Sequence, residues 1–542
     1  MGQAGRLSLP VLPKKGHAIS ESAAVRSTDP MSADSLVDPS PVVLHQQERS
    51  RPSSRWVRWA AFVLVAVLGL LLRLPQLGAR PMHTDEAVNA YIVGQMLAGE
   101  SYVYDPQDRH GPTLAALALP LARLQGAKTF AGLTEPELRL TTVLAGTVTI
   151  LLFGAAVEFF GFVPCLIAAL LFACAPLPLY YDRYFIHESL FSAATFGLIV
   201  AAAHACRKLS AVHAVLAAIC AALILTSKET SILHFFALSA AALVFWLWNL
   251  RRSSLGRLWR SKAVLPAFAA FVLISVALFT WFGSNWKALP ALLYAVPNYL
   301  ARAAGEGHQK PFWYFAQLLT GGWSGGTICA LACIGFFLTA RKRDPSAYGF
   351  LAYYAAFLAV IYSLIPYKTP WLALNFWLPI ALFSGLAIES LWRMPKKYPA
   401  LRMLMPALCI LLVAWVAVSI AHDTRQRVFA HPADERNPYA YAQTSEGLLD
   451  LPAEMAELAH QNAFASPRIE VIAADPWPLP WYLRHFSQVG FWQPGQQVGD
   501  ADFYITSSEA ADQYGNRLQN LRPEFFELRP GVLIVLWPPA PK

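Results

Sequence analysis

The stretch RPMHTDEAVNAY (residues 80–91) places two carboxylates, Asp85 and Glu86, side by side just after a long apolar run. A carboxylate in such a position can act as a general base. A structural explanation is also available. Thr84 can cap a helix whose first turn then holds both acids, and the helix dipole favours acids there. Which explanation applies depends on the groups that converge on the two acids.

Three further groups of ionisable residues lie at the ends of apolar runs. They are Asp105, Asp108, Arg109 and His110 in YDPQDRHGP; Asp182, Arg183, His187 and Glu188 in YYDRYFIHES; and the lysines Lys228 in SKET and Lys368 in YKTPW. Ionisable groups at membrane-helix ends are costly unless paired, so their repeated occurrence indicates a functional site. Arg and Lys side chains there can bind a phosphate, although a single interfacial cation is often only a membrane anchor.

A divalent metal is a further possibility, because several of these residues have suitable ligand types. The candidate ligands are His83, Asp85, His110, His187 and Glu188. Their spacing does not match a known metal site. Each histidine can instead be an interfacial side chain bonded to the backbone, so the sequence predicts no certain cofactor.

The elements that must position these residues are membrane helices. Of the 542 residues, 56% are hydrophobic and only 14% are charged, and the mean hydropathy is +0.40, as in an integral membrane protein. The net charge of +9 does not indicate a nucleic-acid partner, because the basic residues form short clusters of the kind found in cytoplasmic loops. These clusters lie at 251–262, 341–343 and 393–397.

The topology predicted from these patterns brings the polar groups to one face. Residues 1–55, polar and rich in Ser and Pro, predict a disordered cytoplasmic arm, and residues 56–421 predict a polytopic membrane domain with twelve apolar segments to consider. All four polar groups then face outside, provided that one of the three segments between 112 and 180 does not cross. We therefore expect about eleven crossings, and the sequence does not say which segment is the exception.

From residue 422 the composition changes to short apolar strands between polar helices and turns. Residues 422–542 therefore predict a small extracytoplasmic α/β domain. Its stretch DPWPLPWYLR brings two tryptophans and a tyrosine together. Aromatic rings of this kind suit sugars, but such a stretch more often packs a domain against its neighbour.

Five motifs, in order, resemble those of the GT-C fold membrane glycosyltransferases. They are RPMHTDEA, YVYDPQDRHGPTL, LYYDRYFIHESL, TSKET and YKTPWL. The resemblance is closest to the dolichyl-phosphate-mannose–protein mannosyltransferase-like group, and within it to the subgroup named flippase-activity-associated proteins. The tail stretches YAYAQTSEGLLDL and DPWPLPWYLR also resemble that subgroup, so the resemblance covers roughly residues 60–542.

This resemblance implies transfer of a sugar from a polyprenyl-phosphate donor to a protein, lipid or glycan acceptor on the outer face, with inversion. It implies Asp85 as the general base with Glu86 beside it. Glu188 stands where the superfamily often has an Asp, and Arg183 matches the Arg that precedes that acid. The candidates for binding the lipid phosphate are Arg109, Arg183, Lys228 and Lys368.

Two other functions fit the same fold. One is a non-enzymatic accessory to the translocation of lipid-linked oligosaccharides, which binds without turnover. The other is an ion-coupled transporter, which agrees less well with charged residues at outer helix ends instead of mid-membrane. In each case the predicted fold is an α-helical polytopic membrane protein, GT-C-like, with a small C-terminal extracytoplasmic α/β domain.

Overall fold

The computed structural model describes residues 52–248, 262–304, 308–340, 346–397, 400, 402–518 and 521–539. Most of the predicted arm at 1–55, and nearly all of the basic clusters at 251–262 and 341–343, therefore lie outside the described residues. The first helix, α1 (Pro52–Arg73), already includes residues 52–55. The membrane domain thus begins four residues before the predicted position 56.

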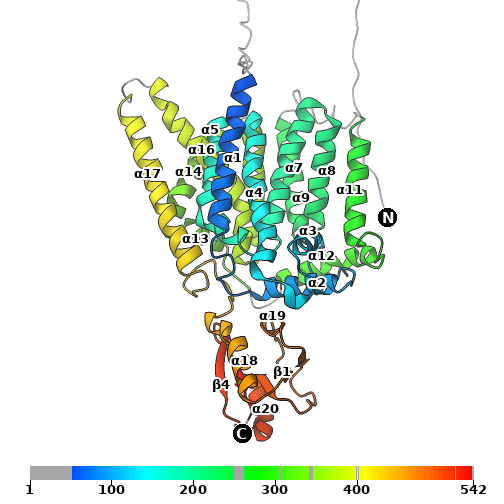
Figure 1. The fold of residues 1–542 in the computed structure, drawn as a ribbon. Helices are drawn as coiled ribbons and strands as arrows, with labels where there is room; N and C mark the ends of the chain where they lie inside the picture. The colour runs from blue at the N-terminus through cyan, green and yellow to red at the C-terminus, as the bar shows by residue number, and fades with distance from the viewer. Residues whose placement is uncertain are drawn as a thin grey trace, which may run out of the picture. The chain divides into compact units, whose positions relative to one another are not determined.

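Long apolar helices form most of the described chain (Figure 1). Within the described residues, seven helices are long and apolar enough to cross a membrane. They are α1, α4 (Glu135–Phe160), α7 (Glu188–Lys208), α14 (Gly322–Ala340), α15 (Ala347–Leu364), α16 (Leu374–Lys397) and α17 (Leu404–Thr424). An eighth span results if α5 (Phe162–Cys174) and α6 (Pro176–Asp182), which meet at 59°, are taken together. The chain is an integral membrane protein, as its hydropathy predicts.

Of the three segments between 112 and 180, the one containing α3 (Thr113–Leu124) has a helix too short to cross a membrane. This helix has 12 residues, a length of about 18 Å against about 30 Å of hydrocarbon. Glu86, before α3, and Arg139, after it, form an ion pair, so the chain returns to the same end of the bundle.

Besides α3 and α12 (Ala288–Ala304), three shorter apolar helices are present in the described residues. They are α8 (Ala211–Leu225), α9 (Ser231–Trp248) and α11 (Val264–Phe279). Together with the seven spans and the bent pair they make eleven, the number expected from the sequence. Because these three are short for a span, eleven crossings remain a prediction.

The predicted site residues meet at one end of the helices. Here lie α2 (Thr84–Leu97) and α12 (Ala288–Ala304), next to the C-terminal sheet in Figure 1. An ion pair between Lys228 and Glu188 joins the α8–α9 connection to the start of α7. The short elements η1 (Phe130–Gly132), α13 (Tyr314–Thr320), η2 (Pro370–Ala373) and η4 (Arg425–Ala430) complete the described helices of the membrane domain.

A buried ion pair fixes α6 beneath this end. The Arg73 guanidinium at the end of α1 donates to the Asp182 carboxylate at 2.7 Å, and both side chains are fully buried. Arg73 also donates to the carbonyls of Phe172 and Ala173, which helps to offset the cost of burying its charge. Gly146 of α4 lies directly against the Asp182 carboxylate, where a Cβ would clash. The packing of α1, α4 and α6 is therefore set by particular residues.

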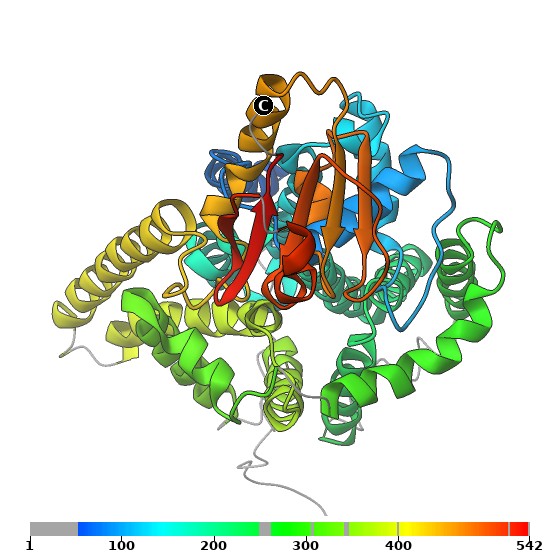
Figure 2. The ribbon, with the colours of Figure 1, turned by 90° about the horizontal axis from the view of Figure 1, so that it is seen from below.

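The C-terminal residues form a five-stranded sheet in the order β2-β1-β3-β5-β4, seen face-on in Figure 2. The strands are β1 (Arg468–Ile472), β2 (Gln488–Trp492), β3 (Phe503–Ser507), β4 (Glu524–Arg529) and β5 (Val532–Trp537). β1 pairs in parallel with β2 and β3, whereas β5 pairs antiparallel with β3 and β4. The helices are η5 (Glu446–Leu449), α18 (Leu451–Gln461), α19 (Leu479–Tyr482) and α20 (Ser508–Leu518). The predicted small C-terminal α/β domain is confirmed, but α17 and η4 continue to Ala430, beyond the predicted boundary at residue 422.

This domain contacts the loop that precedes Asp85. The Met82 N–H donates to the Tyr482 hydroxyl at 2.8 Å, and the Thr444 hydroxyl donates to the Met82 carbonyl at 2.6 Å. The Trp481 indole N–H donates to the Glu135 carboxylate at the start of α4 at 2.7 Å. The sheet domain thereby holds residues 81–83 in place.

Candidate active site

His83, and not Thr84, caps the helix that carries the two acids. The His83 Nδ1 accepts from the Asp85 backbone N–H at 3.0 Å, while the Glu86 carboxylate accepts from the His83 N–H at 3.2 Å. The helix start is a capping box, in which the His83 side chain faces the Glu86 N–H and the Glu86 carboxylate accepts from the His83 N–H. Since Nδ1 is an acceptor, Nε2 carries the proton and donates to the Tyr441 carbonyl at 3.1 Å. Burial lowers the pKa of His83, consistent with a neutral ring whose two nitrogens are both occupied.

Glu86 is held in a fully buried network. Its oxygens accept from Arg139 at 2.8 Å each and from the Phe185 N–H at 2.8 Å, and Arg80 lies 3.5 Å away. Burial alone would raise the pKa of Glu86, but the two arginines lower it to about 2. With its oxygens engaged and no exposure, Glu86 joins α2, α4 and the α6–α7 loop. This geometry fits a positioning residue and does not support the expected catalytic role.

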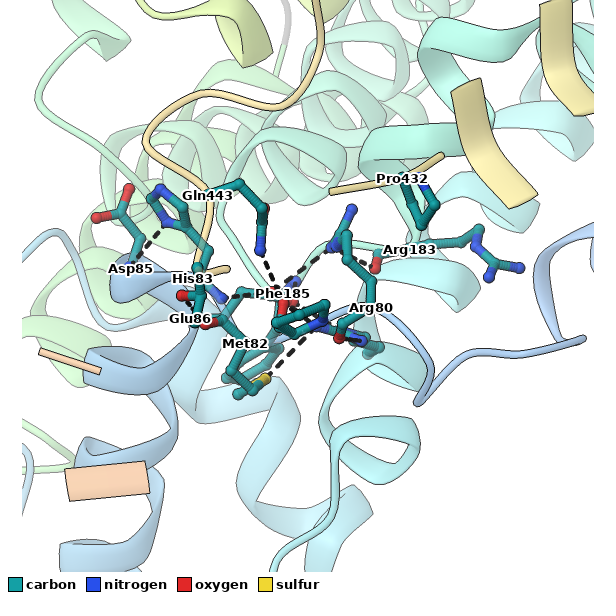
Figure 3. Close-up of polar contacts among 12 residues, drawn as sticks. Arg80, Met82, His83, Asp85, Glu86, Arg183, Phe185, Pro432 and Gln443 are labelled. Atoms are coloured by element: carbon teal, nitrogen blue, oxygen red, sulfur yellow. Dashed lines mark hydrogen bonds and ion pairs between the residues drawn. The ribbon is translucent and has the colours of Figure 1, made fainter. Parts of the chain in front are cut away.

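Asp85 has the opposite environment, although it is the adjacent residue. Its side chain is half-buried, and Figure 3 shows it pointing away from Glu86 and Arg80. Among the described residues, none forms a hydrogen bond or an ion pair with its carboxylate. The Asp85 carboxylate is therefore available to a substrate.

A cavity of about 210 Å³ lies beside Asp85. It is lined by Asp85, Val88, Asn89, Ile92, Tyr102, Asp108, Arg109, His110, Gly111, Leu114, Ala115, Phe185, His187 and Trp477. These residues come from α2, the loop before α3, α3 itself, the loop before α7 and the C-terminal domain. The cavity thus brings together Asp85, three residues of the second polar group (Asp108, Arg109 and His110) and, from the third group, His187 alone.

Arg109 is the cation of the predicted set that lines this cavity. Its Nε lies 3.4 Å from the carboxylate of Asp108, and about a quarter of its side chain is exposed. Asp108 is largely exposed, so this pair is weak. Arg109 can therefore exchange its carboxylate partner for a bound phosphate at little cost.

His110, in the same wall, is paired with a residue that the sequence analysis did not single out. The His110 Nδ1 lies 2.7 Å from the Glu229 carboxylate, which is buried. Burial alone would raise the pKa of Glu229, but His110 lowers it to about 2. Gly111 makes this pairing possible, since a Cβ at that position would overlap the Thr226 carbonyl. Glu229 stands next to Lys228 in the SKET motif, and that was its only signal in the sequence.

Glu188 and Lys228 form an ion pair with each other. Their charged groups lie 2.6 Å apart and both side chains are largely buried. Burial alone would lower the pKa of Lys228, but Glu188 raises it. In this arrangement neither the predicted second acid nor the predicted phosphate ligand is available to a substrate.

Arg183 and Lys368 are bound to backbone carbonyls instead of lining the cavity. The Arg183 guanidinium donates to the carbonyls of Arg73, Pro75 and Gln76 at 2.6–3.1 Å, and Figure 3 shows it on the far side from Asp85. The Lys368 ammonium donates to the carbonyls of Lys310 and Ile365, and burial lowers its pKa. The expected phosphate-binding role is therefore not supported for either cation.

The residues proposed as metal ligands do not converge on one point. His83 uses both ring nitrogens, as described above, and His110 is bonded to Glu229. Burial lowers the pKa of His187 well below its usual value, and its ring packs edge-on against His110 with centroids 5.1 Å apart. Across the described part of the chain, no group of three or more His, Cys, Asp or Glu residues is arranged to hold a metal ion. The site as it stands does not fit a metal.

The fold is that of known glycosyltransferases. No protein-family model and no curated protein matches the chain. The crystal structure of ArnT from Cupriavidus metallidurans bound to undecaprenyl phosphate is similar, with a TM-score of 0.62 at 16% identity over 89% of this chain and 98% of that one. AglB, the oligosaccharyltransferase of Archaeoglobus fulgidus, in complex with an inhibitory peptide and a dolichol-phosphate, has a TM-score of 0.57 at 12% identity over 88% and 73%. Both have the GT-C fold expected from the motifs, whereas the finer subgroup remains a prediction.

Proposed function

We propose that the protein is a membrane glycosyltransferase that moves a sugar from a polyprenyl-phosphate donor to an acceptor hydroxyl, with Asp85 as general base. The observation that carries this proposal is the Asp85 carboxylate, which faces a cavity while the neighbouring acids Glu86, Glu188 and Glu229 are all paired. The fold supports a lipid-linked donor, because the similar ArnT and AglB structures contain undecaprenyl phosphate and dolichol-phosphate.

The proposed reaction is a single displacement. Asp85 accepts the proton of the acceptor hydroxyl while the oxygen attacks the anomeric carbon of the donor sugar. The bond between that carbon and the phosphate oxygen breaks, the electron pair leaves with the polyprenyl phosphate, and the anomeric configuration inverts. A sugar hydroxyl is a poor nucleophile, so a placed base contributes about 10²–10⁴-fold.

The leaving phosphate requires stabilisation by a cation, and Arg109 is the candidate in the cavity wall. A guanidinium forms charge-assisted bonds with phosphate oxygens, and these bonds strengthen as charge develops. His110, whose Nδ1 is held by Glu229, lies beside it in the same wall. Asp85 and Arg109 thus provide the two opposite functions, proton acceptance and phosphate stabilisation, in one cavity.

The proposed topology places this cavity on the outer face. The basic clusters at 251–262 and 341–343 are expected in cytoplasmic loops. We therefore expect the site and the C-terminal domain on the extracytoplasmic side. Donor lipid then reaches the site from the outer leaflet, and the acceptor is a protein, lipid or glycan on that side.

The test is transfer of radiolabelled sugar from polyprenyl-phosphate-mannose and polyprenyl-phosphate-glucose in membranes that contain the wild type or Asp85→Asn. We expect label in a product with the wild type and at least 100-fold less with the variant. Donor lipid that binds the wild type and the variant equally, with no transfer by either, favours the accessory function in oligosaccharide translocation.

A further inference from the structure

The two tryptophans of DPWPLPWYLR have different environments. Trp481 is fully buried, its indole N–H donates to Glu135 at 2.7 Å, and the Arg484 guanidinium lies 3.7 Å from the centre of its ring. Trp481 therefore fastens the C-terminal domain to the membrane domain. Trp477, four residues earlier, is only half-buried and lines the Asp85 cavity.

The turn that carries Trp477 is fixed in place. Its backbone N–H donates to the Asp475 carboxylate at 3.3 Å, and Asp475 pairs with Arg529 of β4 at 2.6 Å. The Trp477 ring also packs edge-to-face against Tyr91 of α2, with centroids 5.8 Å apart. In the described part of the chain no hydrogen-bond partner is present for the Trp477 indole N–H. The ring is thus held at the cavity, and its indole N–H is available to donate a hydrogen bond.

The other cavity walls carry the groups that bind a sugar ring. Asp85 and Asp108 can accept hydrogen bonds from sugar hydroxyl groups, and Arg109 can donate hydrogen bonds to sugar oxygens. Asn89 donates to the Phe185 carbonyl at 3.2 Å, so its own carbonyl oxygen is left to accept. The negative face of an aromatic ring attracts the weakly positive C–H face of a sugar. A few polar groups opposite one aromatic wall set the orientation of such a ligand.

From this arrangement we infer that Trp477 is the stacking platform for the acceptor, and that the acceptor is a carbohydrate. The inference rests on the proposed function. The donor sugar is tied to a lipid within the membrane, whereas Trp477 belongs to the sheet domain, which lies beyond the ends of the membrane helices (Figure 1). A sugar stacked on Trp477 presents its hydroxyls to Asp85 in the same cavity. Trp477 is accordingly a specificity residue, contributed by a domain that supplies none of the proposed reacting groups.

Binding is tested without turnover, by saturation-transfer NMR on the full chain in nanodiscs. The probes are methyl α-mannopyranoside, methyl β-glucopyranoside and methyl α-arabinofuranoside, with a threonine-containing hexapeptide for comparison. We expect saturation of at least one glycoside, lost in Trp477→Ala and largely kept in Trp477→Phe. Asp85→Asn keeps an oxygen that can accept a hydrogen bond, so it should weaken this signal far less than Trp477→Ala does. Phe525→Ala is the matched control, because Phe525 is an exposed aromatic residue of the same domain outside the cavity lining.

Two results would overturn the inference. One is the absence of any glycoside signal that depends on Trp477, and the other is a signal from the hexapeptide alone. Because Asp85→Asn removes turnover and not the platform, loss of transfer with retained glycoside binding separates this inference from the proposed function. Where transfer is measurable, Trp477→Ala should raise the acceptor KM about 5- to 10-fold with donor KM unchanged.

Discussion

Replacing Asp85 by Asn and Glu86 by Gln compares two adjacent acids whose environments predict opposite outcomes. Asp85→Asn keeps the size of the side chain and removes the proton acceptor. The described residues give the Asp85 carboxylate no hydrogen bond or ion pair to lose. The remaining cost is a first-turn charge that favours the helix dipole, about 0.3–1 kcal/mol. Folded protein should therefore persist while the transfer rate falls at least 100-fold.

Glu86→Gln should act on stability first. The Glu86 carboxylate is fully buried between Arg139 and Arg80, and removing its charge leaves two buried guanidinium groups without their counter-ion. Breaking a buried pair in this way costs about 3–5 kcal/mol. Activity per folded molecule should change far less than in Asp85→Asn, because Glu86 does not line the cavity.

The assay measures thermal unfolding of each purified variant in detergent and sugar transfer normalised to the folded fraction. A high Tm with low transfer for Asp85→Asn, and a low Tm with residual transfer for Glu86→Gln, is the expected result. Unchanged Tm and unchanged transfer in Asp85→Asn would refute the base assignment and reduce the adjacent acids to helix capping. Loss of transfer in Glu86→Gln at wild-type Tm would assign a catalytic role to Glu86, against the base assignment to Asp85.

Three further predictions concern the cavity wall and the topology. Gly111→Ala should lower Tm and transfer together, because the added Cβ meets the Thr226 carbonyl. Gly447→Ser, at an exposed glycine, is the control for the loss of a glycine. The folded pKa of Glu229, about 2, lies below its ordinary value of 4.5, so its contribution to stability is complete above about pH 4.5 and is lost as the pH falls toward 2. Tm measured from pH 7 to pH 3 should accordingly fall less steeply in Glu229→Gln than in the wild type. A cysteine at position 255 in a cysteine-free background should resist an impermeant maleimide in intact cells, and its labelling from outside would contradict the topology.

Hydropathy and charge predicted the membrane fold because each span is a local property of the sequence. The apolar runs marked most helices, and the short strands after residue 422 marked the sheet domain. The segment at 112–130 was ambiguous because it is mostly apolar, with Arg123 and Lys128 only near its end, whereas its helix has only 12 residues. That helix ends at Leu124 because Gly126 follows with a φ of 98°, the left-handed conformation that glycine adopts after a helix. The ion pair of Arg139 with Glu86, to which the chain then returns, is a contact that no local pattern reveals.

The site was predicted less completely, because residue type does not tell which charges are already paired. Asp85 and Glu86 have the same functional group, but successive helix positions face different directions. Arg139, whose guanidinium pairs with Glu86, stands at the start of an apolar run, and no motif marks it. Lys228 likewise was expected to bind phosphate and is instead neutralised by Glu188. Such pairings depend on contacts between helices far apart in the sequence.

The pairing of charges also predicts different results for Arg109 and Arg183, the two arginines that the sequence predicted to bind the donor phosphate. Arg109→Met should leave Tm within error, because an exposed ion pair contributes about 0–1 kcal/mol. A hydrogen bond to a charged group is worth about 1.5–3 kcal/mol, so its loss should reduce kcat/KM for the polyprenyl-phosphate donor about 10- to 100-fold.

Arg183→Met should instead unfold the protein more readily. It leaves the carbonyls of Arg73, Pro75 and Gln76 without their donors. Arg73 is buried, so its unpaired carbonyl costs about 1–3 kcal/mol, whereas Pro75 and Gln76 are exposed and their carbonyls can bind water. The lost bonds all lie at the end of α1, away from the cavity, so donor kcat/KM per folded molecule should stay close to that of the wild type. An Arg183→Met protein with normal Tm and weakened donor binding would return this side chain to the phosphate. It would also show that the loop after α6 rearranges when the lipid binds.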